Sequence, residues 1–418
     1  MSQKTYTLRY GSIRRGEELI DEVLVALFRT PHSFTGEDTV EITCHGSVYI
    51  QQQIMQLLIE NGCRTALPGE YTQRAFMNGK MDLSQAEAVA DLIASTSAGQ
   101  HRLALNQMRG GFSNELRNLR EQLLHITSLM ELELDFSDHE ELEFADRSEL
   151  SALAGHIEGV ISRLANSFSV GNAIKNGIPV AIIGETNAGK STLLNALLNE
   201  EKAIVSDIHG TTRDVIEDTI NIQGIMFRFI DTAGIRETHD AIESIGIERT
   251  FLKLDQANII LWMIDATDAP QQIAQLSDKI LPRCEGKQLI LVFNKADLMT
   301  GDPNVLLPVG FPENIQSIFL SAKKKENINE LQDLLVQAAH LPSLSQNDII
   351  VTNIRHYEAL THALASIHRV QEGLSANLSG DFVSQDLREC IFHLSDIVGE
   401  VTTDQVLGNI FERFCVGK

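Results

Sequence analysis

The stretch GETNAGKS, residues 184–191, constrains the fold of this chain most, because it has the pattern of a phosphate-binding loop. It follows the apolar run IPVAIIG and precedes a helical segment, the context that such a loop requires. Gly184 and Gly189 permit turns that point backbone amides at phosphate oxygens beside a helix N-terminus. Lys190 would reach the β- and γ-phosphates, and the Ser191 hydroxyl would bind magnesium. The loop therefore predicts an α/β nucleotide-binding domain.

Four later motifs, in the expected order, select guanine. Asp231 in DTAG would hold magnesium through water, and Gly234 would sense the γ-phosphate. Asp297 in NKAD can accept the ring N–H and the amino hydrogens of guanine, a donor pair that adenine does not present. SAK at 321–323 would give a backbone amide to the guanine oxygen, and Thr212 in GTTRD would close on magnesium. The predicted GTP-binding residues are Asn187, Ala188, Gly189, Lys190, Ser191, Thr192, Ser206, Asp207, Ile208, His209, Gly210, Thr211, Thr212, Asp231, Thr232, Ala233, Gly234, Asn294, Lys295, Asp297, Ser321, Ala322 and Lys323.

The hydrolysis chemistry is less ordinary than the nucleotide site. Small G proteins use a glutamine directly after DTAG to orient the attacking water, but Ile235 stands there and cannot hydrogen-bond water. No motif marks an arginine finger acting in cis, and Arg213 and Arg236 are only candidates for it. The residues alone leave open a domain that binds GTP and barely hydrolyses it.

The charge balance restricts how this chain could bind nucleic acid. It has 34 basic and 57 acidic residues, a net charge of −23, whereas a broad nucleic-acid-binding face normally has a basic excess. If RNA is a partner, a local patch or a second subunit must supply most phosphate contacts. No apolar run is long enough to cross a bilayer, and the N-terminus has no signal-peptide core. With five scattered cysteines, these features predict a cytoplasmic protein without membrane insertion.

The secondary-structure pattern predicts a multidomain chain. Short β-like runs and one helix come first, then long helices, then apolar strands alternating with helices, and finally more helices. This order places an α/β domain, a mostly parallel sheet with helices on both faces, between two halves of a helical region. The predicted domains are an N-terminal α+β domain at 1–78, the first helical half at 79–172, the nucleotide-binding domain at 173–341 and the second helical half at 342–418.

Two features of the first helical half give specific predictions. Ser84 and Glu87, three residues apart in DLSQAEAVADLI, fit a capping box at a helix start. An apolar stripe with spacings of three and four residues predicts core packing in a bundle. Its residues are Leu116, Leu119, Leu123, Ile126 and Met130.

The C-terminal FCVGK places Cys415 four residues from the end, as in a prenylation box. That box requires aliphatic residues at both middle positions, which here are Val416 and Gly417, so we expect no prenylation. Cys415 is then either a buried structural cysteine or part of a site.

The motifs together resemble the tRNA-modification GTPase family called MnmE or TrmE, over essentially the whole chain. The similar stretches are HSFTGEDTVEITCHG, PGEYTQRAFMNGKMDLSQAEAVADLI, DIHGTTRDV, DTAGIRET, IESIGIER and the terminal CVGK. The first two and the last do not occur in other GTPases. The resemblance implies a P-loop GTPase domain inserted in a helical domain, and an N-terminal folate-binding-like domain that dimerises.

The resemblance also implies the reaction. Family members are potassium-dependent GTPases that act as homodimers with a flavin-carrying partner, MnmG or GidA. Together they modify carbon 5 of the wobble uridine, position 34, of certain tRNAs, and the partner grips most of the tRNA. A one-carbon folate such as 5-formyltetrahydrofolate binds the N-terminal domain.

Residue roles follow by similarity. Glu243 in IESIGIER would position the attacking water, replacing the missing glutamine. Ser191 and Thr212 would bind magnesium. A potassium ion would replace the arginine finger and stabilise the charge that develops during phosphoryl transfer. The implied potassium ligands are Asn187, Ser206, Ile208 and Thr211.

For the folate, the resemblance implies Glu41, Lys80 and Lys418. A carboxylate suits the paired N–H donors of a pterin, and lysines suit a glutamate tail. Cys415 would lie toward this pocket and assist the modification chemistry. Family members usually carry a preceding segment with a GRGG-like stretch and a folate-contacting arginine, and this chain starts downstream of it.

Two other classes compete with this interpretation. A ribosome-assembly GTPase of the Era or Der type shares the nucleotide motifs but carries a basic RNA-binding domain after them. Here residues 382–414 are helical and acidic, without a glycine loop flanked by basic residues. A membrane-switch G protein would need lipidation and a polybasic C-terminal segment.

Overall fold

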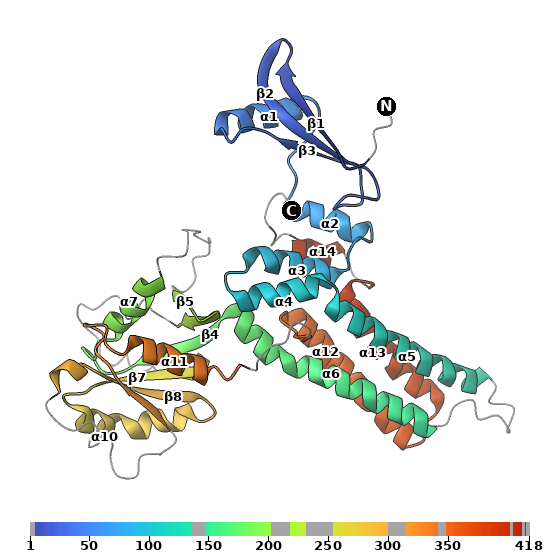
Figure 1. The fold of residues 1–418 in the computed structure, drawn as a ribbon. Coiled ribbons are helices and arrows are strands. Elements are labelled where there is room, and N and C mark those ends of the chain that lie inside the picture. Colours follow the sequence, from blue (N-terminus) through green and yellow to red (C-terminus); the bar gives the residue numbers. More distant parts are fainter. Residues whose placement is uncertain are drawn as a thin grey trace. The chain divides into compact units, whose positions relative to one another are not determined.

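The computed structural model describes residues 5–135, 147–201, 218–230, 254–299, 315–341, 348–401, 404–411 and 414 (Figure 1). The chain divides into two compact units. The first unit comprises Met1–Ser95, His101–Phe168 and Gln346–Lys418, and the second comprises Thr96–Gln100 and Ser169–Ser345. The predicted nucleotide-binding domain, 173–341, falls within the second unit.

The N-terminal part of the first unit is a three-stranded antiparallel sheet with one helix. The strands pair in the order β1-β2-β3, and the register between β1 and β2 shifts at Ile13/Arg14. The short β-like runs and the one helix predicted for this part are present: TVEIT forms β3, and the helix after it is α1. The elements are β1 (Thr7–Arg15), β2 (Glu18–Phe28), β3 (Thr39–Thr43) and α1 (Val48–Glu60).

Helices from both ends of the sequence form one core in the first unit. α5, α12 and α13 pack along one another (Figure 1). The predicted apolar stripe of α5, from Leu116 to Met130, is buried in this core. α14 packs on α2 around Phe411 and Phe414. The helices are α2 (Glu70–Met77), α3 (Leu83–Ala94), α4 (Ala98–Met108), α5 (Gly111–Asp135), α6 (Arg147–Asn176), α12 (Ile354–Ser375), α13 (Gly380–Val398) and α14 (Asp404–Phe411).

The capping box of α3 is not the predicted one. Asp82, rather than Ser84, is the N-cap: its carboxylate accepts from Gln85 N, and Asp82 N donates to Gln85 Oε1, both at 3.0 Å. Ser84 donates instead to Asp82 Oδ1. Glu87, the predicted acid of that box, is buried, and its carboxylate bonds to His356 of α12 instead of to the backbone at the start of α3.

The second unit contains the predicted α/β domain, a six-stranded sheet of order β5-β6-β4-β7-β8-β9. All pairs are parallel except β5 with β6. The antiparallel edge strand β5 was not predicted, since DTINI is short and half exposed. The strands are β4 (Ile178–Ile183), β5 (Asp218–Ile222), β6 (Ile225–Phe229), β7 (Ile259–Asp265), β8 (Gln288–Asn294) and β9 (Gln316–Phe319).

Helices cover both faces of this sheet, as predicted. One buried cluster joins Val180 and Ile182 to the helices α7 and α11, and another joins Ala181 and Ile183 to α10. Both faces of β4 are therefore apolar, as in buried parallel strands. The helices are α7 (Lys190–Glu201), α10 (Ala269–Ile280) and α11 (Ile328–Ala338), with short 3-10 helices η1 (Leu281–Cys284) and η2 (Ala296–Leu298).

Among the described residues, no helix is both long and apolar enough to span a membrane.

Candidate nucleotide site

The phosphate-binding loop leaves the carboxyl end of β4 and enters α7. At Gly184, a Cβ atom would lie 2.3 Å from the backbone oxygen of Met263 in β7. Only glycine fits there, because any Cβ atom would clash with the backbone of β7, which cannot move aside as a flexible side chain could. Leu193, Leu194 and Leu197 are buried under the sheet and anchor α7, so its N-terminus stays fixed beside the loop.

Gly189 and Asn294 join the phosphate loop to the base-recognition motifs. A Cβ at Gly189 would lie 2.2 Å from Asn294 Nδ2, and its φ of +98° also favours glycine. The buried Asn294 amide donates to Ala188 O at 2.8 Å and accepts from Ala322 N at 3.0 Å. One side chain therefore connects GETNAGKS, NKAD and SAK, and a nucleotide bound across them would meet a prearranged surface.

Lys190 is held over the loop by backbone oxygens. Its Nζ donates to Gly184 O at 2.9 Å and to Glu185 O at 2.7 Å. The ammonium thus adds positive charge to a helix N-terminus, which already favours phosphate. Ser191 is half-buried in the first turn of α7, and Thr192 beside it is exposed. Asn187 is exposed in the loop with a φ of +66°.

Asp297, the predicted guanine acceptor, lies in η2 beside the SAK motif. A hydrogen bond from Ser321, together with Lys324 at 3.4 Å, lowers the pKa of its carboxyl group below the usual range. Its side chain is 12% exposed, so little water competes for the carboxylate. An ionised acceptor in this position matches the two donors on the guanine edge. Lys323, the last residue of SAK, is exposed beside it.

Asp265 is a member of this site that the motifs missed. It ends β7 and pairs with Lys295, whose φ of +62° turns the chain after β8. Burial opposes its charge, but hydrogen bonds from Lys295 and Thr267 lower the pKa of Asp265. Its position was a usable signal, because NIILWMID ends at the same sheet edge as the strands before NKAD and SAK.

Several predicted site residues lie outside the described residues. They are Ser206, Asp207, Ile208, His209, Gly210, Thr211, Thr212, Asp231, Thr232, Ala233, Gly234, Glu243, Cys415 and Lys418. Their assignments stay predictions.

The two described folate candidates, Glu41 and Lys80, are not bonded to each other. Glu41 is exposed on β3, paired in register with Ala26 of β2. Lys80 Nζ donates to Pro31 O at 2.9 Å. Both remain accessible on the N-terminal part of the chain, and neither contact tests the prediction.

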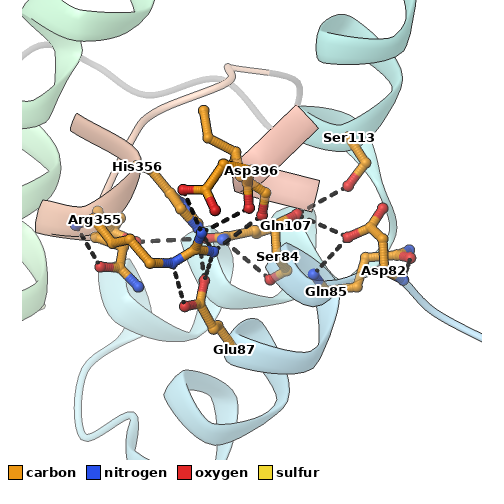
Figure 2. A network of polar contacts seen from close by, with 12 residues as sticks. Asp82, Ser84, Gln85, Glu87, Gln107, Ser113, Arg355, His356 and Asp396 are labelled. Atoms are coloured by element: carbon orange, nitrogen blue, oxygen red, sulfur yellow. Dashed lines mark hydrogen bonds and ion pairs between the residues drawn. The ribbon is translucent and has the colours of Figure 1, made fainter. Parts of the chain in front are cut away.

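A second polar cluster, also missed by sequence reasoning, ties α3 to α12 and α13 in the first unit (Figure 2). Glu87 Oε2 lies 2.6 Å from His356 Nε2, and Glu87 Oε1 accepts from Arg355 Nε at 3.1 Å. Arg355 also donates to the backbone oxygens of Asp396 and Ile397. Burial opposes ionisation, but His356 and Arg355 lower the pKa of Glu87 to about 2. Glu87 lies 268 and 269 positions from Arg355 and His356, so no local pattern could indicate the cluster.

Comparison with known proteins covers the whole chain. Residues 83–415 match the family described as MnmE helical domain, and residues 1–80 match GTP-binding protein TrmE N-terminus. The chain is 74% identical over 420 residues to the tRNA modification GTPase MnmE of Bacteroides fragilis (strain YCH46), covering 100% of this chain and 90% of that protein. It is 53% identical over 425 residues to the protein of that name from Flavobacterium johnsoniae, with the same coverage. A solved structure of Era, in complex with MgGDPNP and nucleotides 1506–1542 of 16S ribosomal RNA, has 29% identity and a TM-score of 0.30. It covers 45% of this chain and 66% of that chain, a likeness too low to inform the fold.

Proposed function

Because this chain belongs to the MnmE family of tRNA modification GTPases, we propose that it hydrolyses GTP while carbon 5 of the wobble uridine, position 34, is modified in certain tRNAs. The observation that carries the proposal is the match over the entire chain, including the helical and N-terminal parts. The ribosome-assembly alternative shares only the nucleotide motifs with this chain. The reaction would be GTP hydrolysis, the cleavage of an acid anhydride.

The residue types of the phosphate loop and of the predicted switch threonine fit magnesium and triphosphate. A serine hydroxyl, a threonine hydroxyl and phosphate oxygens are hard oxygen ligands, the kind that Mg²⁺ prefers. We assign Ser191 and Thr212 to the ion, which when bound neutralises charge on the β- and γ-phosphates. Lys190 would exchange its two backbone oxygen acceptors for phosphate oxygens. Among the described residues, no His, Cys, Asp and Glu cluster could hold a metal by itself.

Guanine selection would rest on Asp297, with Asn294 holding the surrounding loops. Asp297 accepts from the ring N–H and the amino group of the base. The Ala322 N–H already donates to Asn294 Oδ1 at 3.0 Å, so it can reach the guanine oxygen only as a shared donor.

Hydrolysis would depend on a potassium ion and on Glu243. Asn187 is exposed in the loop, so its side-chain oxygen is available to an ion beside the phosphates. Together with Ser206, Ile208 and Thr211, it would complete an oxygen shell without an arginine finger. Glu243 would then hold the attacking water when two nucleotide domains meet.

We further propose a homodimer formed through the N-terminal sheet. Leu8, Tyr10 and Leu24 are 65%, 69% and 41% exposed, and the register places all three on one face. Such an apolar patch is typical of a protein interface. Glu41 pairs with Ala26 on this same face, so this proposed folate-binding residue would lie close to the partner subunit.

The remaining assignments follow from family membership alone. They are a flavoprotein partner of the MnmG or GidA kind that grips most of the tRNA, a one-carbon folate bound by Glu41, Lys80 and Lys418, a role for Cys415 in the modification chemistry, and a cytoplasmic location. The net charge of −23 supports a partner that supplies the phosphate contacts.

Mass spectrometry of tRNA nucleosides tests the proposal. Cells that lack this protein should lose the carbon-5 modification of the wobble uridine, and this chain should restore it. The Asp297→Asn variant should restore it poorly, because it weakens GTP binding. An unchanged nucleoside profile in the deleted cells would overturn the tRNA assignment and leave the GTP site standing.

A further inference from the structure

The link after α3, Thr96–Gln100, includes the first turn of α4 and has contacts that its neighbours in sequence do not share. Ser95 and His101 belong to the first unit, whereas the link itself belongs to the second. Its sequence TSAGQ contains a capping box for α4. Ser97 Oγ accepts from Gln100 N at 3.2 Å, and Gln100 Oε1 accepts from Ser97 N at 3.1 Å and from Thr96 N at 2.7 Å. The oxygen of the Gln100 amide therefore sets the shape of the link.

The nitrogen of the same amide reaches a different element. Gln100 Nε2 donates to Lys175 O at 2.8 Å, in the last turn of α6. The last carbonyls of a helix have no N–H donor within the helix, and this bond supplies one from outside it. A Cβ on Gly99 would lie 3.2 Å from Ile174 Cγ2, so the link packs directly against the end of α6.

The link also contacts the β5–β6 hairpin. Asn221 Nδ2, near the end of β5, lies 3.5 Å from Thr96 O and donates to it. In sequence, β5 follows the predicted switch residue Thr212, and β6 ends immediately before Ile230 and Asp231. β6 pairs with β4, the strand that enters the phosphate loop. The hairpin is thus covalently continuous with both segments expected to respond to the γ-phosphate.

We propose that Thr96–Gln100 transmits the nucleotide state of the second unit to α3 and to the rest of α4, and that Gln100 is the positioning residue that holds this link. A change at the γ-phosphate moves the segments flanking the hairpin, and the hairpin moves the link. α3 carries Glu87, bonded to His356 in α12, so a displaced link also reaches the C-terminal helices. The proposal goes beyond GTP hydrolysis, since it names the route by which hydrolysis reaches the helical part of the chain.

Gln100→Glu separates this role from helix capping. Glutamate keeps an acceptor for Ser97 N and Thr96 N and suits a helix N-terminus. It loses the donor to Lys175 O and places a carboxylate oxygen against that carbonyl. Gln85→Glu is the matched control, because Gln85 holds the same position in the α3 capping box and donates to Met108 O at 3.1 Å, entirely within the first unit.

Hydrogen–deuterium exchange of the full chain tests the proposal, comparing MgGDP with MgGDPNP. In the wild type we expect peptides of α3 and α4 to differ in exchange rate by about fivefold or more, the lower end of ordinary allosteric coupling. Gln100→Glu should remove the difference, and Gln85→Glu should retain it. Gly99→Val, which forces a larger side chain against Ile174, should also remove it and serves if Gln100→Glu does not fold.

Three results would overturn the proposal: no nucleotide-dependent difference in the wild type, a difference that survives in Gln100→Glu, or its loss in Gln85→Glu as well. The measurement needs no tRNA and no partner, so its failure is distinct from failure of the tRNA assignment.

Discussion

Replacing Glu87 by glutamine should destabilise the first unit strongly. Glu87 is 7% exposed and accepts from both Arg355 and His356. In Glu87→Gln an amide nitrogen replaces one acceptor oxygen, so at least one of these buried donors loses its partner. Removing one member of a buried ion pair costs about 3–5 kcal/mol. Arg355 keeps its bonds to two backbone oxygens, so we expect about 3 kcal/mol, the lower end of that range.

The pKa of Glu87 gives the same magnitude and sets its pH dependence. Its displacement from 4.5 to about 2 corresponds to about 3 kcal/mol. Because the folded-state pKa is lowered, the stabilisation is complete above the unfolded-state pKa and is lost as pH falls toward the folded-state value. The stability difference between wild type and Glu87→Gln should therefore shrink by about 1 kcal/mol between about pH 7 and about pH 4.

Urea unfolding measures this difference, followed by far-ultraviolet circular dichroism. The single tryptophan, Trp262, is buried in β7 of the second unit, so its fluorescence is an internal reference that should not shift. Glu158→Gln is the matched control: Glu158 also bridges two helices through a histidine, His368, at 3.0 Å, but its side chain is 34% exposed. We expect that control to lose less than about 1 kcal/mol. Equal losses in the two variants, or a difference that does not change with pH, would refute the reasoning.

Three further predictions concern the nucleotide site. Gly189→Ala should weaken mant-GDP binding at least about a hundredfold, because its Cβ would overlap Asn294, whereas Gly286→Ala, at a positive φ with no atom within 4 Å, should not. Asp297→Asn should lose two charge-assisted hydrogen bonds to guanine, which lowers GTP affinity by about 3 kcal/mol. The variant should prefer xanthosine triphosphate, and a retained preference for GTP in competition binding would refute the assigned role. GTP turnover should be markedly faster in potassium than in sodium at matched ionic strength, and Asn187→Ala should abolish that difference; equal rates in the wild type would exclude the ion.

The nucleotide domain was predictable because its signals are local. A phosphate loop, a strand ending in NKAD and a strand ending in SAK each carry their own pattern, and parallel strands bring their carboxyl ends to one edge. What the motifs could not indicate is how they connect. The sequence pattern predicts Asn294 only as a GTP-binding residue. In the structure its side-chain amide also bonds to Ala188, 106 positions away, and to Ala322, 28 positions away.

Three capping-box patterns, the first two overlapping, show where prediction from local sequence fails in the helical part. Residues 82–100 contain D-x-x-Q at Asp82, S-x-x-E at Ser84 and S-x-x-Q at Ser97, and each fits the rule equally well. The structure uses the first and the third. The second fails because its acid, Glu87, has stronger partners in α12: two charge-assisted bonds outweigh one bond to a backbone N–H.

The choice between glutamine and glutamate at these positions also follows from distant partners. A capping box accepts either residue, since each offers an oxygen to the N-cap amide. Gln85 and Gln100 both use the amide nitrogen to reach a carbonyl in another helix, Met108 O and Lys175 O. A glutamate at either position would cap the helix as well, but its carboxylate would repel the carbonyl. Glutamate is favoured where the neighbouring group is a cation, as Arg355 is for Glu87. A glutamine at the third helical position, in a chain with 57 acidic residues, therefore indicates a second acceptor nearby, and at Gln100 that acceptor is the carbonyl of Lys175 at the end of α6.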